Sequence, residues 1–246
     1  GFDAWDEKIT GHSNNDPNDK PTEEEVDAAY KVIEEEEDAQ KETNKSELSI
    51  HEAAKSGDIE SIKQYIDSGS DLELICQTCG LTILGHASWG GHKEIIILLI
   101  AEGININIKD RHGSGPLLPA VLGGKKDIVE ILINEGANVN SKNNDNISPL
   151  HLAARDGRSE IAEMLIDKGA DINLKNNYGI TPLYYACARG HNETAELVIN
   201  KGANVNVRVS LGEYKGYTPL DSTIKWNHPE TADLLRKHGA KTGEEL

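Results

Sequence analysis

The chain has 246 residues, of which 37% are apolar, and a formal net charge of −17, so it can form one large domain or an elongated array of repeats. The acidic balance argues against nucleic acid and anionic membranes as partners, because like charges repel and few counterions would be released on binding. The longest apolar run, Ile95–Ala101, is far shorter than the about 20 residues of a membrane-spanning helix, and three cysteines are too few for a disulfide framework.

The first part of the chain is strongly acidic, since residues 1–47 contain 16 Asp/Glu against 5 Lys. Residues 1–45 are expected to form a separate N-terminal segment that is flexible at its start. Within this segment Thr22 and Glu25 form a capping box. Apolar residues then recur along one helical face, which predicts a helix at 22–41. This helix either covers the apolar end of the region that follows or acts as an acidic interaction tail.

Two series of glycines follow, both with spacings of 34, 33, 33, 33 and 37 residues. One series closes helix-like segments, at Gly69, Gly103, Gly136, Gly169, Gly202 and Gly239. The other marks a turn inside each unit, at Gly57, Gly91, Gly124, Gly157 and Gly190, with Asn227 in the sixth place. A unit of this size is a pair of helices that cannot bury its apolar face alone. The units are therefore expected to stack into an all-α repeat solenoid.

Three of the units begin a helix in the same way, with Ser148-Pro149, Thr181-Pro182 and Thr218-Pro219. The hydroxyl side chain caps the first turn, and proline takes a position whose amide has no intrahelical partner. The fuller motif Ser-Pro-Leu-His-Leu-Ala-Ala spans Ser148–Ala154. A second motif, Gly-Ala-Asp/Asn-apolar-Asn, recurs at Gly136–Asn140, Gly169–Asn173 and Gly202–Asn206. In these motifs the chain closely resembles the ankyrin-repeat family.

The resemblance covers residues 46–241 and implies six repeats, each a helix-turn-helix with a β-hairpin loop. The implied units are about 46–74, 77–108, 110–142, 143–175, 176–208 and 213–241, and a tail at 242–246 follows. Ankyrin repeats bind partners through the hairpin tips and the concave face of the first helices. Transferred to this chain, the resemblance implies these partner-binding residues: Trp89, Arg111, His112, Arg155, Asp156, Tyr178, Arg189, Tyr214, Lys215 and Trp226.

Two of these residues, Trp89 and Trp226, are the tryptophans of the repeat region, and both fall near the end of a first helix. Exposed tryptophan is typical of binding hot spots, although each ring can also pack over its own repeat. Two departures from the pattern stand out. Pro119 falls inside a first helix, where it is expected to remove a hydrogen bond and kink the chain. An insertion lengthens the loop Val207–Gly216, which is expected to form a longer hairpin.

Little in the sequence indicates chemistry. Cys76 and Cys79 form a Cys-x-x-Cys motif, but no second pair of ligands follows at a spacing suited to zinc. Inert thiols are favoured, with a disulfide or a metal site as alternatives, so no metal site, cofactor or catalytic residue is expected. His51 and His151 occupy the histidine position of the signature, and by resemblance this imidazole bridges neighbouring backbones.

The expected function is therefore a non-enzymatic protein–protein interaction module. The partner is expected to be a protein with a basic surface, and the chain to be a monomer by itself, without nucleic-acid or membrane partners. One alternative is a dedicated inhibitor or immunity protein for an enzyme. A further one is a redox-responsive or metal-responsive protein that uses Cys76 and Cys79. A cytoplasmic location is favoured, and the start at Gly1 leaves a processed or exported form open.

Overall fold

The computed structural model describes residues 50–246. The acidic segment and the helix expected at 22–41 lie outside the described residues. The described part begins in a helix that covers residues 50–56. The helices that follow are α3 (Ile59–Asp67), α4 (Ile83–Gly90), α5 (Lys93–Ala101), α6 (Leu117–Leu122), α7 (Lys126–Asn134), α8 (Pro149–Arg155), α9 (Ser159–Asp167), α10 (Pro182–Ala188), α11 (Asn192–Asn200), α12 (Pro219–Lys225) and α13 (Pro229–Lys237).

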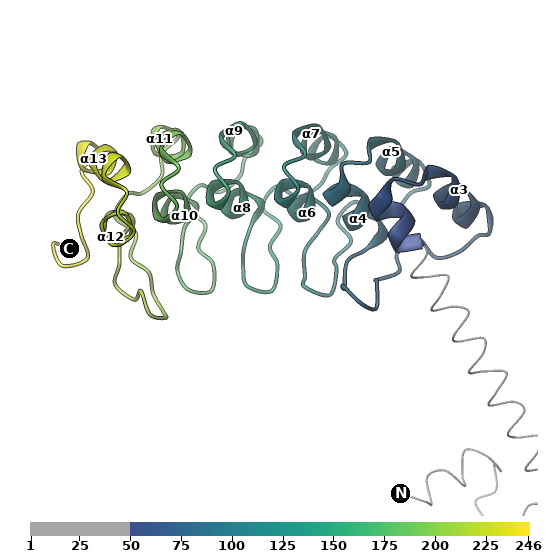
Figure 1. Ribbon diagram of the computed structural model, residues 1–246, viewed down its shortest axis with the longest axis horizontal. Coiled ribbons are helices and arrows are strands. Elements are labelled where there is room, and N and C mark those ends of the chain that lie inside the picture. The colour runs from purple at the N-terminus through teal and green to yellow at the C-terminus, as the bar shows by residue number, and fades with distance from the viewer. Residues whose placement is uncertain (1–49) are drawn as a thin grey trace, which may run out of the picture. The chain divides into compact units, whose positions relative to one another are not determined.

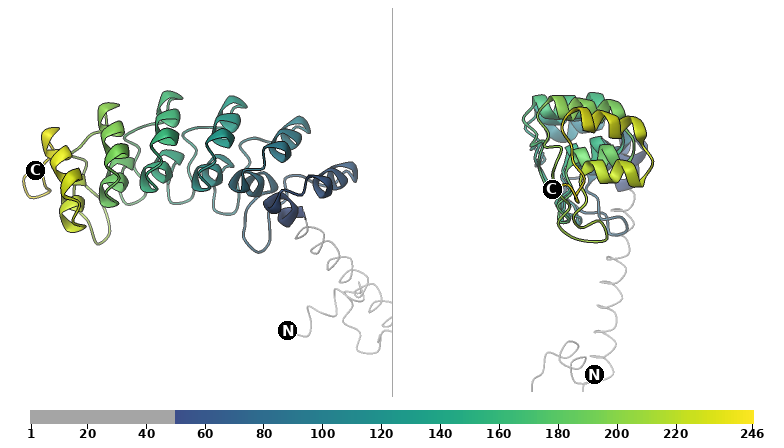
Figure 2. Two further views of the ribbon diagram at one scale, coloured as in Figure 1. Left: turned by 45° about the horizontal axis from the view of Figure 1, so that its top comes forward. Right: turned by 90° about the vertical axis from the view of Figure 1, so that its left-hand side faces the viewer.

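The helices of residues 50–246 are arranged as consecutive antiparallel pairs in two rows (Figure 1). The first helices of the pairs, α4, α6, α8, α10 and α12, form one row and are called the inner helices here. The second helices, from α5 to α13, form the outer row, and Figure 2 shows both rows from two further directions. Each inner helix contacts the next inner helix along the chain. This nearest-neighbour stacking confirms the all-helical repeat solenoid.

Loops between successive pairs protrude on the side of the inner helices (Figure 1). Within residues 50–246 these hairpin loops contain one isolated antiparallel bridge, between Ile75 and Thr82, and no longer strand. Backbone bonds join each tip to the next, for example from the Asn144 amide to the His112 carbonyl at 2.9 Å. The loops therefore form a connected row along one edge of the array.

Local sequence signals determine where the inner helices begin. The hydroxyl groups of Ser148, Thr181 and Thr218 accept the backbone amide three residues later, as predicted. Both glycine series have positive φ, and Asn227, in the sixth place of the turn series, has a φ of 58°. A side chain at Gly157 would also collide with the His191 imidazole of the next repeat. The turn glycines therefore serve both backbone conformation and close packing.

The hydrogen bond that Pro119 was expected to remove is missing from α6. Pro119 is the third residue of α6, which begins at Leu117 after Pro116. At the equivalent position of other repeats the amide donates to the carbonyl four residues earlier, as in His86, Leu152, Tyr185 and Ser222. Proline has no amide hydrogen, and the Gly115 carbonyl accepts from the Leu118 amide instead, at 3.1 Å. The inner helix of the third repeat begins one residue after Pro116, whereas α8, α10 and α12 begin at the proline itself. Pro116 and Pro119 therefore both lie at the start of α6.

The core lies between the two rows and repeats with the same period as the sequence. Leu99, Leu132, Leu165, Val198 and Leu235 occupy equivalent places in successive outer helices, and each is fully buried. Leu99, Leu132 and Leu165 belong to one core cluster that extends over several repeats, and Val198 and Leu235 belong to a second, so the core is shared between repeats.

Asparagine side chains form a second connection between repeats. Each donates from Nδ2 to a glycine carbonyl and accepts at Oδ1 from a backbone amide of the following repeat; these residues are Asn107, Asn140, Asn173 and Asn206. For Asn140 the two bonds are 3.0 Å to Gly169 and 2.8 Å from Asp171. The final Asn of the Gly-Ala-Asx-apolar-Asn motif is thus a structural bridge.

Replacing Asn140 by Ala is expected to lower the free energy of unfolding by about 1–3 kcal/mol, because two inter-repeat hydrogen bonds are lost at roughly 0.5–1.5 kcal/mol each. Urea denaturation followed by circular dichroism measures this loss. Asn200→Ala is a matched control, since Asn200 is exposed at the end of α11, and its effect should stay within about 0.5 kcal/mol. Equal losses in the two variants would contradict the bridging role.

Candidate partner-binding groove

A groove of about 580 Å³ lies on the inner surface of the array, where α4, α6 and α8 meet the hairpin loops. Apolar side chains of the inner helices, including Leu118, Leu122 and Leu152, form one side of it. The opposite side is polar and comes from the loops, including Asp110 and Asn144. An apolar surface bordered by polar groups is typical of a recognition site.

Three of the predicted partner-binding residues line this groove. They are Trp89 from α4, His112 from a hairpin loop and Arg155 from α8. The Trp89 side chain is 43% exposed, so its ring offers apolar area to the groove while part of it packs against the protein. The His112 Nε2 atom lies 3.3 Å from the carbonyl oxygen of Cys79, which holds the imidazole at the neighbouring loop.

Arg155 and the adjacent Asp156 are bonded to each other. The Arg155 Nε and Nη2 atoms donate to the two carboxylate oxygens at 2.8 and 3.1 Å. This hydrogen bonding lowers the pKa of Asp156 and raises that of Arg155. The pair therefore presents a fixed, nearly neutral polar group next to the groove, and Arg158 lies 3.9 Å from the same carboxylate.

Arg111, Tyr178 and Arg189 lie outside the groove lining. The Arg111 guanidinium donates to the Gln77 carbonyl at 3.2 Å, across two hairpin loops. Tyr178 is 51% exposed at a loop tip, and Arg189 is exposed at the end of α10. Arg111 and Tyr178 thus lie in the row of hairpin loops, and Arg189 lies in the row of inner helices.

Tyr214 and Trp226 belong to a separate cluster in the last repeat. The hairpin that contains the insertion folds against the end of α12, where the Tyr214 and Trp226 ring centroids are 6.5 Å apart. The Lys225 ammonium lies 4.4 Å from the Tyr214 ring centroid, and Lys215 lies on the same exposed loop. Trp226, although 49% exposed, thus packs within its own repeat, and this contact gives the longer loop a folded position.

The signature histidine bridges two repeats. The Ser148 amide donates to Nδ1 of His151 at 3.2 Å, and Nε2 faces the Ile180 carbonyl at 3.0 Å. Nδ1 is then the acceptor and Nε2 the donor, which is the neutral tautomer. Burial lowers the pKa of His151 to about 4. His51 Nε2 makes the equivalent contact with the Leu74 carbonyl at 3.2 Å.

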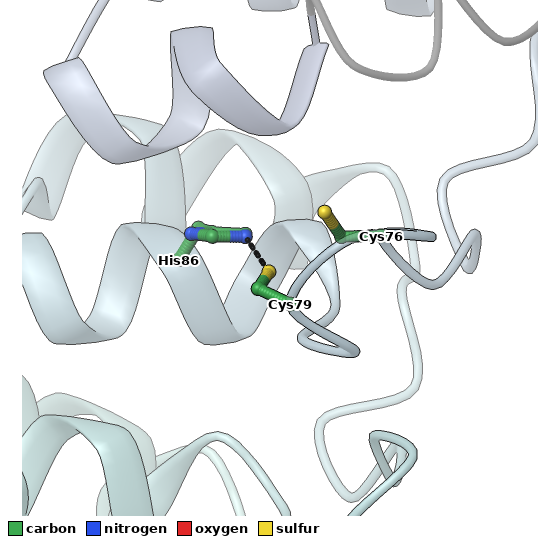
Figure 3. A group of neighbouring side chains, drawn as sticks. All are labelled: Cys76, Cys79 and His86. Atoms are coloured by element: carbon green, nitrogen blue, oxygen red, sulfur yellow. Dashed lines mark hydrogen bonds between the residues drawn. The ribbon is translucent and has the colours of Figure 1, made fainter.

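The second repeat contains a cluster that the sequence did not predict. Cys76 and Cys79 on the hairpin loop lie beside His86 of α4, and their ligand atoms are all within 4.8 Å of one another (Figure 3). The Cys79 Sγ atom is 3.1 Å from Nε2 of His86. Cys79 is exposed, while Cys76 and His86 are buried. A signal was present in the sequence as Cys-x-x-Cys followed by His86, but a search for paired ligands overlooks a single histidine.

The charge states of this cluster follow from its surroundings. Burial raises the pKa of the Cys76 thiol, but hydrogen bonds from Thr78 and the backbone of Cys79 outweigh burial and lower the pKa to about 7. Burial, assisted by the nearby His51, lowers the pKa of His86 to about 4. By contrast, complete burial raises the pKa of Cys187, so that thiol stays protonated.

The paired helices, protruding loops and grooved inner surface define a helical repeat protein whose scaffold presents a binding surface. A family model described as ankyrin repeats (3 copies) matches residues 50–143, 113–176 and 150–245. The chain therefore belongs to the ankyrin-repeat family, as its motifs predicted. A search of curated proteins found no match.

Ankyrin repeats indicate a protein–protein interaction module, and the family is typically non-catalytic. None of the helices described in residues 50–246 has the length and apolar content that crossing a membrane requires.

Proposed function

We propose that the groove at α4, α6 and α8 binds a protein partner, with Trp89 as its apolar anchor. The supporting observation is the half-exposed Trp89 ring beside an apolar groove of about 580 Å³. Tryptophan is enriched among the few interface residues that dominate binding free energy. The neighbouring His112 and the Arg155–Asp156 pair supply polar groups that can orient the bound segment.

The proposed partner has a basic surface, because the chain carries a net charge of −17 and complementary charge accelerates association. In this proposal the protein is a monomer without catalytic activity and works in a reducing compartment such as the cytoplasm. The loop residues Arg111, Tyr178, Tyr214 and Lys215, together with Arg189 and Trp226 at helix ends, extend the contact beyond the groove. The same acidity suits a narrower role as the inhibitor of a basic enzyme, whose activity would then fall on binding.

Trp89→Ala is expected to weaken partner binding by at least about 2 kcal/mol, or roughly 30-fold in Kd, because a central aromatic anchor is lost. Its cost in folding should remain below the about 3–5 kcal/mol of removing a buried aromatic side chain. The experiment compares proteins captured from native lysate by wild type and variant, then measures the Kd of the purified partner and the thermal stability of each chain.

Ile97→Ala is the matched control, since Ile97 is 49% exposed on the outer helix α5 and should leave the Kd unchanged. A Kd that is the same for Trp89→Ala and wild type would remove Trp89 from the binding surface. A large loss of stability would instead assign the ring a packing role.

A further inference from the structure

We propose that Cys76, Cys79 and His86 form a zinc site in the second repeat, with a fourth coordination position that opens onto the groove. The two sulfur atoms and the imidazole nitrogen already lie within 4.8 Å of one another (Figure 3). Cys79 and His86 also line the groove, which makes the open position accessible from there. This proposal does not depend on protein binding at the groove.

The distances suit a tetrahedral ion. Zinc lies about 2.3 Å from sulfur and about 2.0 Å from nitrogen, so its tetrahedral ligand atoms are roughly 3.3–3.8 Å apart. Here Cys79 Sγ and His86 Nε2 are 3.1 Å apart, and no pair of the three ligand atoms exceeds 4.8 Å. Shifts of about 1 Å, within the reach of side-chain rotation, would complete the geometry.

The loop holds its two cysteines in a defined position. The Cys76 amide donates to the Leu81 carbonyl, and the Gly80 amide donates to the Cys76 carbonyl, both at 2.8 Å. Gly80 has a φ of 78°, which closes the turn after Cys79. His86 follows within the first turns of α4, whose start is capped by Thr82. Ligands on a closed turn and on a helix are pre-organised for a metal ion.

Cys76 occupies a loop position that holds Asp or Asn in the next three repeats, where the side-chain oxygen accepts hydrogen bonds. In those loops Asp110, Asn143 and Asn176 each accept two backbone amides at the side-chain oxygen, at 2.8–3.0 Å. In the second repeat the Cys76 sulfur occupies this position and lies 3.1 Å from the Thr78 hydroxyl. Sulfur therefore replaces oxygen in this loop, and a cysteine thiolate is a metal ligand.

The position of His86 holds other residue types in the repeats that follow. The equivalent residues of the next three repeats are Pro119, Leu152 and Tyr185. His86 is 6% exposed, and within the described residues its Nδ1 atom has no hydrogen-bond partner. A buried imidazole with an unsatisfied nitrogen is costly where Leu or Pro would suffice. His86 therefore occurs in the same repeat as the two cysteines and lies beside them.

The chemical nature of the three ligand atoms indicates which metal ion the site prefers. Two thiolates and a neutral imidazole suit zinc, whereas calcium and magnesium prefer oxygen ligands. Binding displaces any remaining thiol proton to solvent. Three protein ligands leave one tetrahedral position, which a water molecule fills by itself and which a side chain of a bound protein can take.

The test is a titration of the full chain, reduced and free of metal, with Co²⁺ followed by displacement with Zn²⁺. We expect one Co²⁺ per chain, visible absorption of tetrahedral cobalt and near-ultraviolet thiolate charge transfer from two Co–S bonds. Zinc should displace cobalt and abolish both signals. A spectrum of octahedral cobalt without thiolate charge transfer, or no binding at all, would overturn the proposal.

Matched variants assign the ligands. Cys79→Ser, at an exposed position, and His86→Leu, which introduces the side chain of the fourth repeat, should each weaken zinc binding by more than about 100-fold, because even indirect changes around a metal cost about 10–100-fold. Cys187→Ala, which changes a cysteine outside the cluster, should retain wild-type affinity. Circular dichroism verifies that each variant is folded. Wild-type zinc affinity in folded Cys79→Ser or His86→Leu would show that no such site exists.

Discussion

Replacing Leu132 by Ala should lower the free energy of unfolding by about 2–5 kcal/mol, the largest effect that we expect from a single substitution in the array. Leu132 lies in the last turn of α7, is fully buried, and belongs to the core shared by neighbouring repeats. Removing its isobutyl group loses the transfer free energy and leaves a cavity that the stacked helices fill only in part. Because repeats depend on their neighbours, the loss weakens the coupling on both sides of α7.

Urea denaturation followed by circular dichroism measures this effect, and Leu122→Ala provides a control with the same chemical change. Leu122 ends α6 and is 43% exposed at the groove, so its truncation should cost less than about 1 kcal/mol. A reduced denaturant slope in Leu132→Ala would indicate that the two halves of the array unfold separately. Similar losses in the two variants would contradict the core position of Leu132.

Acidification from about pH 6.5 to pH 4 should remove about 3 kcal/mol of stability through His151 alone. Burial lowers the pKa of this imidazole from 6.5 to about 4, with a partly opposing hydrogen bond to Ile180. The unfolded chain takes up a proton near pH 6.5, whereas the folded chain resists it until about pH 4. The contribution of His151 is therefore complete above pH 6.5 and is lost as the pH falls through this window.

The measurement is the free energy of unfolding as a function of pH for wild type and His151→Gln. The variant should be less stable at pH 7, because the bridge between Ser148 and Ile180 is lost. Its stability should fall less steeply between pH 6.5 and 4, by up to about 1.4 kcal/mol per pH unit for one proton. Above pH 7 the two curves should run parallel. Identical slopes in the acid range would show that His151 does not titrate as its burial requires.

The sequence by itself determined the repeat, its period and the caps that begin three of the inner helices. These features depend on residues close together in the chain, such as the cap at Ser148, Pro149 at the first turn and the positive φ of Gly157. The bridging role of His151 was implied by family resemblance for the same reason, since this residue lies within the short motif Ser148–Ala154. The sequence also predicted the hydrogen bond lost at Pro119, but it did not predict that α6 would begin at Leu117 rather than at Pro116.

The tertiary structure alone decided which side chains meet. Stacking brings Trp89, His112 and Arg155 from three repeats to one groove, and folds Tyr214 of the longer loop against Trp226. It also places His86 beside Cys79, because the hairpin returns across the start of the helix that follows it. Such contacts depend on helix rotation and loop direction, and a difference of one residue in the loop changes them. A repeat period specifies that units stack, whereas the path of each loop decides what their side chains can bind.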